Sequence, residues 1–220
     1  MNKILPFSHN WLALKINNDC LKQNLSLIKG RVIDLGCGTM PYKADILKVA
    51  DEYIGVDWYS SLHDQSNIDV FADLTNTLPF PEGYADTVVA FQVMEHLAEP
   101  ELFLMECYRI LKRGEVIFLM VPFMWHVHEA PHDYFRYTRY GLKYLLEKSG
   151  FADIAISENT GFWQTWVLKF NYHTTRYARG PIKYLLIPIW WLGQVVAPLL
   201  DKYDKNPNEC GSYTVVAKKP

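Results

Sequence analysis

One stretch near the N-terminus decides how this chain folds: Val32-Ile33-Asp34-Leu35-Gly36-Cys37-Gly38. It begins as a short apolar run, which is typical of a buried strand, and two glycines follow at once. A helical pattern then covers residues 43–50. A strand, a glycine turn and a helix in this order begin an open α/β sheet, in which ligands bind beyond the carboxyl ends of the strands.

Apolar runs alternate with helical patterns along most of the remaining chain. Continuous runs of Val, Ile and Phe between helices are typical of a parallel sheet that is covered on both faces. Thr138 is placed to cap the helix that begins at Arg139. The predicted strands span residues 31–35, 53–57, 70–72, 86–91, 116–121, 152–156 and 213–217, and the predicted helices span residues 18–28, 43–50, 100–111 and 139–148.

Length and composition narrow the function classes. We expect the 220 residues to form a single domain, 1–220, and the balance of 22 basic against 24 acidic side chains gives no reason to expect nucleic-acid binding. The four cysteines form no CxxC pair, which argues against a metal ribbon and a disulfide framework. The N-terminal apolar stretch is too short for a secretory signal. We therefore expect a reduced, cytoplasmic compartment.

The glycine turn and two acids indicate a nucleotide-like ligand. Glycines at 36 and 38 let the backbone approach a ligand, and a helix N-terminus offers free N–H groups. Pro41 stands where a dinucleotide fingerprint needs its third glycine, which argues against NAD or FAD. Asp57 ends the second strand and can accept both hydroxyls of a ribose, while Asp73 and Leu74 can meet an adenine. The alternative for both acids is turn formation at the ends of strands.

Taken together, these motifs resemble the class I S-adenosylmethionine-dependent methyltransferases, in the type 11-like branch that is found near small-molecule and glycan biosynthesis. The resemblance covers about residues 30–151 and includes Tyr53-Ile54-Gly55-Val56-Asp57, Leu78-Pro79-Phe80 and Gln92-Val93-Met94-Glu95-His96-Leu97. It implies an α/β three-layer sandwich whose Rossmann-like, seven-stranded sheet is mainly parallel and has an antiparallel last strand.

The resemblance also implies a cofactor, S-adenosylmethionine, which would leave as S-adenosylhomocysteine. The implied cofactor-binding residues are those of the loop after the first strand, of the second and third strand ends, and of the turn near the sulfonium: Asp34, Gly36, Cys37, Gly38, Asp57, Trp58, Asp73, Leu74 and Gln92. Two positions depart from the family. Met40 replaces a common third loop glycine, which is expected to alter the path of the loop, and Lys112-Arg113-Gly114-Glu115 replaces the usual Lys-Pro-Gly-Gly turn.

Three histidines follow the fifth predicted strand, in His126-Val127-His128-Glu129-Ala130-Pro131-His132. Methyl transfer from a sulfonium to an easily deprotonated acceptor needs no metal, so we expect no metal site. Histidine suits proton removal at neutral pH, and we take His128 as the first candidate base and His132 as the second. The alternative is that both shape the loop by hydrogen bonds. We expect Asp133 and Arg136 to form a structural ion pair, and His96 to cap or pack.

Residues 159–211 form a predicted insertion between the last two strands. Its first part, 159–200, contains no Asp or Glu but holds four of the seven tryptophans. The segment 184–200 is nearly all apolar, yet it is shorter than a membrane span and contains two prolines. We expect a lid, a homodimer patch, or a peripheral membrane contact through residues 181–200 at the inner face of the membrane.

The sequence thus predicts methyl transfer to a heteroatom, with oxygen preferred, of a small molecule or glycan. Two alternatives stay open. One is a membrane-associated methyltransferase that acts on a lipid-linked or quinone-type acceptor. The other is a non-catalytic, cofactor-binding scaffold of the same fold.

Overall fold

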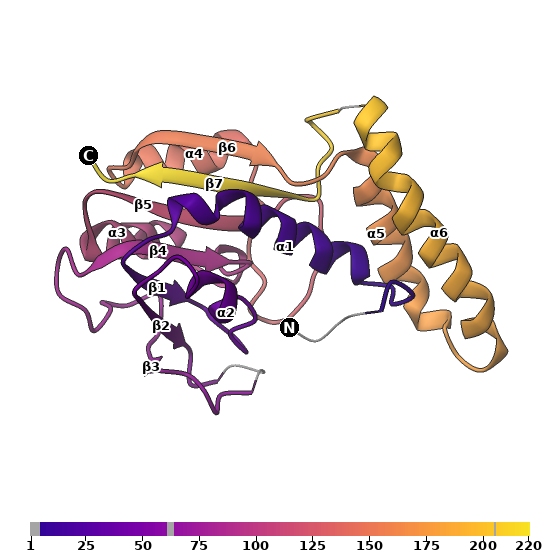
Figure 1. Cartoon of the computed structure of the whole chain (residues 1–220), viewed down its shortest axis with the longest axis horizontal. Helices are drawn as coiled ribbons and strands as arrows, with labels where there is room; N and C mark the ends of the chain where they lie inside the picture. The colour runs from indigo at the N-terminus through magenta and orange to yellow at the C-terminus, as the bar shows by residue number, and fades with distance from the viewer. Residues whose placement is uncertain (1–4, 61–63, 205) are drawn as a thin grey trace. The chain divides into compact units, whose positions relative to one another are not determined.

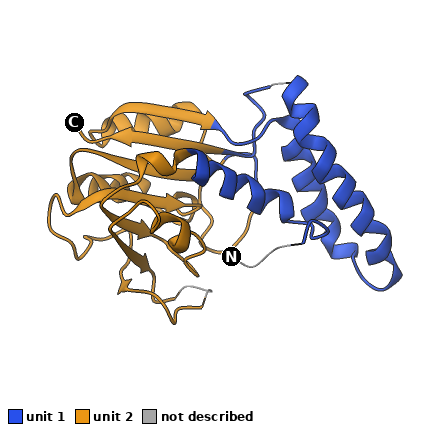
Figure 2. Cartoon of the chain, viewed as in Figure 1, with its two compact units in different colours: residues 1–23, 123–126, 158–212 blue, residues 24–122, 127–157, 213–220 orange. Residues whose placement is uncertain are grey.

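The computed structural model describes residues 5–60, 64–204 and 206–220, and the predicted N-terminal apolar stretch therefore lies partly outside the described residues. The chain divides into two units (Figure 2). Unit 1 comprises residues 1–23, 123–126 and 158–212, and unit 2 comprises residues 24–122, 127–157 and 213–220. The single domain with an insertion at 159–211 stays a prediction; unit 1 contains that segment together with residues 1–23 and 123–126.

A seven-stranded sheet forms the centre of unit 2, in the order β3-β2-β1-β4-β5-β7-β6 (Figure 1). Strand β1 pairs in parallel with β2 and β4, and β2–β3 and β4–β5 are parallel too. Strand β7 runs against β6 (Figure 1). The predicted fold class is therefore confirmed. The strands are β1 Arg31–Leu35, β2 Glu52–Asp57, β3 Val70–Phe71, β4 Ala85–Phe91, β5 Leu111–Pro122, β6 Ala152–Glu158 and β7 Ser212–Lys218.

The central strands are buried on both faces, as their apolar sequences predict. Helices α2 (Lys43–Ile46), α3 (Pro100–Ile110) and α4 (Arg139–Lys148) flank the sheet (Figure 1). Helix α4 has its predicted bounds, and the Thr138 side chain accepts a hydrogen bond from the Gly141 N–H. Fully buried residues of the strands and of α3 make up the core between these layers, among them Val32, Ile33, Val88, Val89, Phe103, Leu104, Ile117 and Phe118.

Three predicted elements differ from the structure. Helix α1 spans Trp11–Asn24 and thus begins seven residues before its predicted start, because Leu12 and Ile16 extend its buried stripe. Helix α2 ends at Ile46, and the chain continues in turns in which the Lys48 and Val49 N–H groups donate to residues three positions earlier. Strand β5 begins at Leu111 rather than at 116, with a register shift opposite Ala85 and Thr87.

Helices α5 (Phe162–Thr174) and α6 (Pro181–Tyr203) dominate unit 1, with a 3₁₀ turn, η3 (Thr175–Tyr177), between them. Gly193 lets the two helices approach closely, because a Cβ there would lie 3.1 Å from the Val167 side chain. The Trp190 Nε1–H donates to Thr174 Oγ1 at 2.8 Å. Gln194 is fully buried, and its amide accepts from the Leu12 N–H and donates to the Ser8 carbonyl. These contacts hold one side of α6 inside unit 1.

The opposite side of α6 carries an apolar stripe that is exposed. Its members recur every three or four residues, which places them along one helix face. We define the apolar stripe as Leu185, Ile189, Leu192, Val196, Leu199 and Tyr203. Among the described residues, α6 is the one helix long and apolar enough to cross a membrane, and only a small part of its apolar window is buried.

Asp201 of α6 caps the N-terminus of α5. Its carboxylate accepts hydrogen bonds from the backbone N–H groups of Gly161, Trp163 and Gln164 at 2.8–3.1 Å. The first N–H groups of a helix have no partner within the helix, and they carry partial positive charge. A buried carboxylate at this position therefore joins the two helices.

We predict that Asp201→Ala lowers the free energy of unfolding by about 2 kcal/mol, because several charge-assisted hydrogen bonds to a helix N-terminus disappear together. Urea unfolding followed by circular dichroism measures the change. Lys202→Ala, at the exposed neighbouring position, is the matched control and should leave stability within about 0.5 kcal/mol. Equal effects in the two variants would contradict the capping role.

Candidate active site

The glycine loop after β1 lies against the segment that follows β4. Gly36 and Gly38 both have positive φ, at 74° and 51°, where glycine avoids strain. A Cβ on Gly36 would lie 2.5 Å from a methyl group of Val93. The Gly36 and Cys37 N–H groups donate to the Val56 carbonyl of β2. The loop is thus fastened at the carboxyl edge of the sheet, where the predicted ligand site lies.

The Asp57 carboxylate holds this loop from the end of β2. Its Oδ2 accepts from the Gly38 N–H at 2.6 Å, and its Oδ1 accepts from the Trp58 N–H at 2.7 Å. The side chain is largely buried. A carboxylate accepts about four hydrogen bonds, so capacity remains for two ligand hydroxyls. Asp57 therefore fixes the shape of the glycine loop, and its carboxylate can still accept hydrogen bonds from a ligand beside the loop.

Asp34 and Cys37 are both buried beside this loop. The Tyr53 hydroxyl donates to Asp34 Oδ2. Burial raises the pKa of Asp34 to about 7, although the Tyr53 hydrogen bond works in the opposite direction. Burial also raises the pKa of the Cys37 thiol to about 12, so it stays protonated at neutral pH. Neither side chain is poised as a nucleophile.

The Tyr53–Asp34 pair makes stability depend on pH. Because the folded pKa of Asp34 is raised from 3.8 to about 7, this group favours folding most below pH 4, and its contribution falls as pH rises through 7. A hydroxyl donor matters more to the ionised carboxylate than to the neutral acid. We predict that Tyr53→Phe destabilises the protein by about 1 kcal/mol more at pH 8.5 than at pH 5.

Urea unfolding of both proteins at the two pH values measures this difference. Tyr140→Phe, at an exposed position on α4, is the control and should show the same small effect at both pH values. A Tyr53→Phe effect independent of pH would contradict the ionisation of Asp34.

The other predicted cofactor residues lie at the ends of neighbouring strands. Asp73 is exposed, and its carboxylate accepts from the Thr75 N–H and from Asn76 Nδ2, which is a turn-forming role. Leu74 beside it is buried. Gln92 follows β4 with φ 59°, and its N–H donates to the Met120 carbonyl. The ring of Trp58 is partly exposed and meets the His132 ring edge-on, with 5.3 Å between centroids.

The loop that carries His128 and His132 is fastened to the segment after β4. The Tyr134 and Phe135 N–H groups donate to the Glu95 carbonyl, at 2.8 and 3.2 Å. The Tyr137 hydroxyl donates to the Met94 carbonyl at 2.9 Å. These bonds bring residues that are 39–43 positions apart in the chain side by side.

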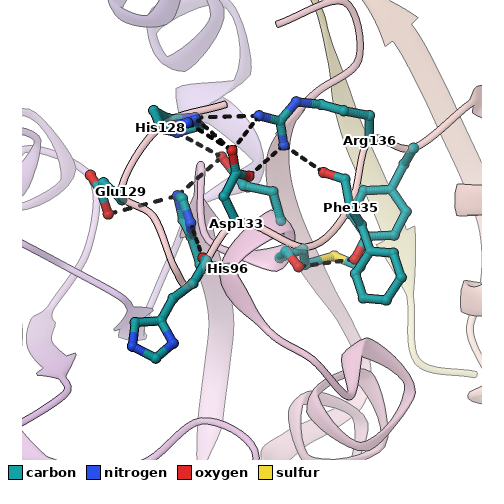
Figure 3. Close-up of polar contacts among 10 residues, drawn as sticks. His96, His128, Glu129, Asp133, Phe135 and Arg136 are labelled. Carbon is teal, nitrogen blue, oxygen red and sulfur yellow. Dashed lines mark hydrogen bonds and ion pairs between the residues drawn. The ribbon is translucent and has the colours of Figure 1, made fainter. Parts of the chain in front are cut away.

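Asp133 and Arg136 form the predicted ion pair, with both carboxylate oxygens 2.6–2.7 Å from guanidinium nitrogens (Figure 3). This pairing lowers the pKa of Asp133 to about 2. The carboxylate also accepts from the backbone N–H of His128 at 2.8 Å, and His128 Nδ1 lies 3.5 Å from it. The expected structural role of the pair is confirmed, because it fixes the position of His128.

Glu95, which sequence reasoning did not assign to the site, lies at its centre. The residue belongs to the 3₁₀ turn η2 (Met94–His96) and is fully buried. Its Oε1 lies 3.7 Å from His96 Nε2 and 3.8 Å from His128 Nε2. Neither carboxylate oxygen has a hydrogen-bond partner in the described part of the chain. Burial raises the pKa of Glu95 to about 8.

The histidine spacing in the sequence does not correspond to this cluster. His126 belongs to unit 1, where its ring contacts Trp125 and Tyr172. The His132 ring is exposed, and its Nδ1 lies 3.2 Å from the Tyr134 hydroxyl. The histidine that joins His128 is His96, which was expected only to cap or pack.

Part of this chain is similar in sequence to known proteins. Residues 33–119 match a family model described as a methyltransferase domain. A probable S-adenosylmethionine-dependent methyltransferase of Mycolicibacterium smegmatis is 35% identical over 97 residues, which are 41% of this chain and 37% of that protein. Residues 33–119 of this chain are thus similar to the methyltransferase domain of such proteins. The match spans little more than a third of the length of the curated relative.

Solved structures agree with the methyltransferase fold. A S-adenosylmethionine-dependent methyltransferase from Archaeoglobus fulgidus has a TM-score of 0.62 at 19% identity, and the likeness covers 94% of each chain. A Haemonchus contortus phosphoethanolamine N-methyltransferase 2, crystallised with S-adenosyl-L-methionine, has a TM-score of 0.61 at 14% identity over 98% of this chain and 56% of that one. At these identities the likeness shows the fold alone.

Met40 shows how the methyltransferase domain accommodates its departure from the family. The residue stands where the resemblance leads us to expect a glycine, and it keeps a positive φ of 54°. Its side chain is buried over Gly55, where a Cβ would lie 2.5 Å from Met40 Cε. Packing against a glycine of β2 therefore compensates for backbone strain in the loop.

Proposed function

We propose that this protein transfers the methyl group of S-adenosylmethionine to a heteroatom, preferably oxygen, of a small-molecule or glycan acceptor. The contact between Trp58 and His132 carries the proposal. Trp58 directly follows Asp57, the proposed ribose ligand, and the His132 loop also contains His128. The contact between the Trp58 and His132 rings therefore connects the proposed cofactor site to the histidine loop, where an acceptor could bind.

Methyl transfer from a sulfonium requires the protein mainly to align the reacting groups and to remove a proton from the acceptor. The sulfonium is already a strong leaving group, so the acceptor, methyl and sulfur must be held in line, with water excluded. Proton removal falls to the histidine loop, where His128 and His132 are the candidate bases. The N-terminal glycine loop and the acids at 34, 57 and 73 are proposed to hold the cofactor.

A variant of Asp57 tests the cofactor side. We predict that Asp57→Ala weakens binding of S-adenosylhomocysteine at least about a hundredfold in a calorimetric titration, because the ribose loses its acceptor and Gly38 loses its anchor. Asp51→Ala, an exposed acid next to the opposite end of β2, is the matched control and should bind normally. Unchanged affinity in Asp57→Ala would overturn the proposed site.

Turnover separates an enzyme from a scaffold. Incubating the protein with S-adenosylmethionine and a panel of hydroxylated small molecules and glycans should release S-adenosylhomocysteine and a methylated product, detected by mass spectrometry. Tight cofactor binding without turnover on any acceptor class would favour the non-catalytic alternative.

We further infer that the protein works in the cytoplasm and contacts the inner face of the membrane through α6. The exposed apolar stripe supports this, together with basic side chains at 179, 183 and 202 near the ends of the helix. Asp201 is the one acid in α6, and it is buried against α5. An amphipathic helix of this charge is typical of a membrane interface, which supports the second candidate function, methyl transfer to a lipid-linked or quinone-type acceptor.

Vesicle co-sedimentation tests the membrane contact. With vesicles that contain anionic lipid, we predict that a triple Ser variant at Ile189, Leu192 and Val196 reduces the bound fraction at least about fivefold, since three exposed apolar anchors are lost. Tyr140→Ser with Tyr144→Ser, exposed on α4, is the control. A wild-type protein that leaves vesicles unbound, and whose light-scattering mass is that of a dimer, would instead assign the stripe to a homodimer.

A further inference from the structure

We propose that Glu95, His96 and His128 bind a divalent transition-metal ion that coordinates the acceptor. Each of the three side chains offers one ligand atom, and these atoms all lie within 4.8 Å of one another. The proposal rests on the proposed methyl transfer for its chemistry, but the metal site itself can be tested without any cofactor or acceptor.

The hydrogen bond of His96 shows which of its nitrogens is free to bind. Its Nδ1 lies 2.7 Å from the His132 carbonyl oxygen, which can only accept, so Nδ1 carries the proton (Figure 3). In the neutral ring Nε2 then presents a lone pair. That lone pair lies 3.7 Å from Glu95 Oε1, which is too long for a hydrogen bond.

His128 completes the arrangement from the other side. Its Nε2 lies 3.8 Å from the same Glu95 oxygen, and its ring meets the His96 ring at 4.8 Å between centroids. Its Nδ1 faces the Asp133–Arg136 pair (Figure 3). A carboxylate behind a ligating histidine is the usual outer partner in metal sites, where it orients the ring.

The Glu95 carboxylate is buried without a hydrogen-bond partner among the described residues, which is an unfavourable state for a charged group. Both Glu95 oxygens are inaccessible and have no hydrogen-bond partner in the described part of the chain. Burying an unpaired carboxylate is strongly unfavourable, and buried charges in proteins are usually paired or coordinate metals. Ligands of one ion with bonds of about 2.1 Å are separated by about 3–3.5 Å. The two Glu95–histidine spacings, 3.7 and 3.8 Å, need to close by a few tenths of an ångström, and the widest spacing of the set, which is within 4.8 Å, by about 1 Å or a little more through side-chain rotation.

The surroundings suit a catalytic ion rather than a structural one. Three protein ligands leave positions open, and the two histidine side chains are partly exposed while Glu95 is closed off. Glu129, on the exposed rim, has its Oε2 3.8 Å from His96 Nε2 and could add a fourth ligand (Figure 3). Two imidazoles with carboxylates favour Mn²⁺, Co²⁺ or Zn²⁺ over Mg²⁺, which prefers oxygen ligands.

The ion would give the acceptor oxygen its reactivity. In this step a hydroxyl oxygen of the acceptor binds the metal, which lowers the pKa of that hydroxyl, and its proton passes to water. The oxygen attacks the methyl carbon, the carbon–sulfur bond breaks, and its electron pair stays on sulfur to give neutral S-adenosylhomocysteine. Under this proposal His128 acts as a ligand rather than as a base, and the expectation of metal-free catalysis is replaced.

Metal titration of the chelator-treated full chain tests the site directly. Co²⁺ binding is followed by its visible absorption and Mn²⁺ binding by calorimetry, with neither cofactor nor acceptor present. We expect one ion per chain, with affinity lowered at least about a hundredfold in Glu95→Gln, His96→Asn and His128→Asn. His126→Asn, in unit 1, is the matched control and should bind like the wild type.

Glu95→Gln separates a lost ligand from a misfolded protein. The amide is isosteric and can donate to a histidine Nε2, so this variant should keep its circular dichroism spectrum and its affinity for S-adenosylhomocysteine while losing the metal. Wild-type protein that binds neither ion below millimolar concentration, or His126→Asn that loses binding as His128→Asn does, would overturn the site. Metal binding without any methyl transfer would instead overturn the proposed function alone.

Discussion

The docking of the histidine loop onto Glu95 is the constraint on which the candidate site depends. Two backbone N–H groups, from Tyr134 and Phe135, converge on the Glu95 carbonyl. This fixes the loop above the end of β4 and leaves the Glu95 side chain buried between two imidazoles. Without that docking, His128 would belong to an exposed connection, and the carboxylate would be free to take up water.

Local sequence signals predicted the scaffold of the site well. The apolar runs of β1, β2 and β4 and the Thr138 cap are decided by neighbours in the chain, and the structure has them where they were predicted. The Asp133–Arg136 pair is local too, because its partners are three residues apart. The predicted start of α1 was too late, because few apolar residues mark the buried side of this helix. The predicted α2 was too long, because the residues after Ile46 form turns rather than helix.

The cluster around Glu95 could not be predicted in the same way. His96 and His128 are 32 positions apart, and they meet because a loop with no periodic pattern folds back on a 3₁₀ turn. The sequence places His126 in one segment with His128 and His132, but the His126 ring contacts Trp125 and Tyr172 in unit 1. The one available signal was a Glu-His pair directly after a buried strand, at the edge where a parallel sheet places its ligands.

A continuous set of contacts connects the two halves of the proposed chemistry. Asp57 holds the Gly38 loop and the Trp58 N–H, the Trp58 ring meets His132, and the His132 carbonyl orients His96 toward Glu95. Each step is a direct contact within unit 2. The same few residues therefore set both the position of Asp57 and Trp58, which border the proposed cofactor site, and the orientation of the His96 ring. A protein built for in-line transfer needs this coupling, because displacing either partner by about 1 Å costs about a hundredfold in rate.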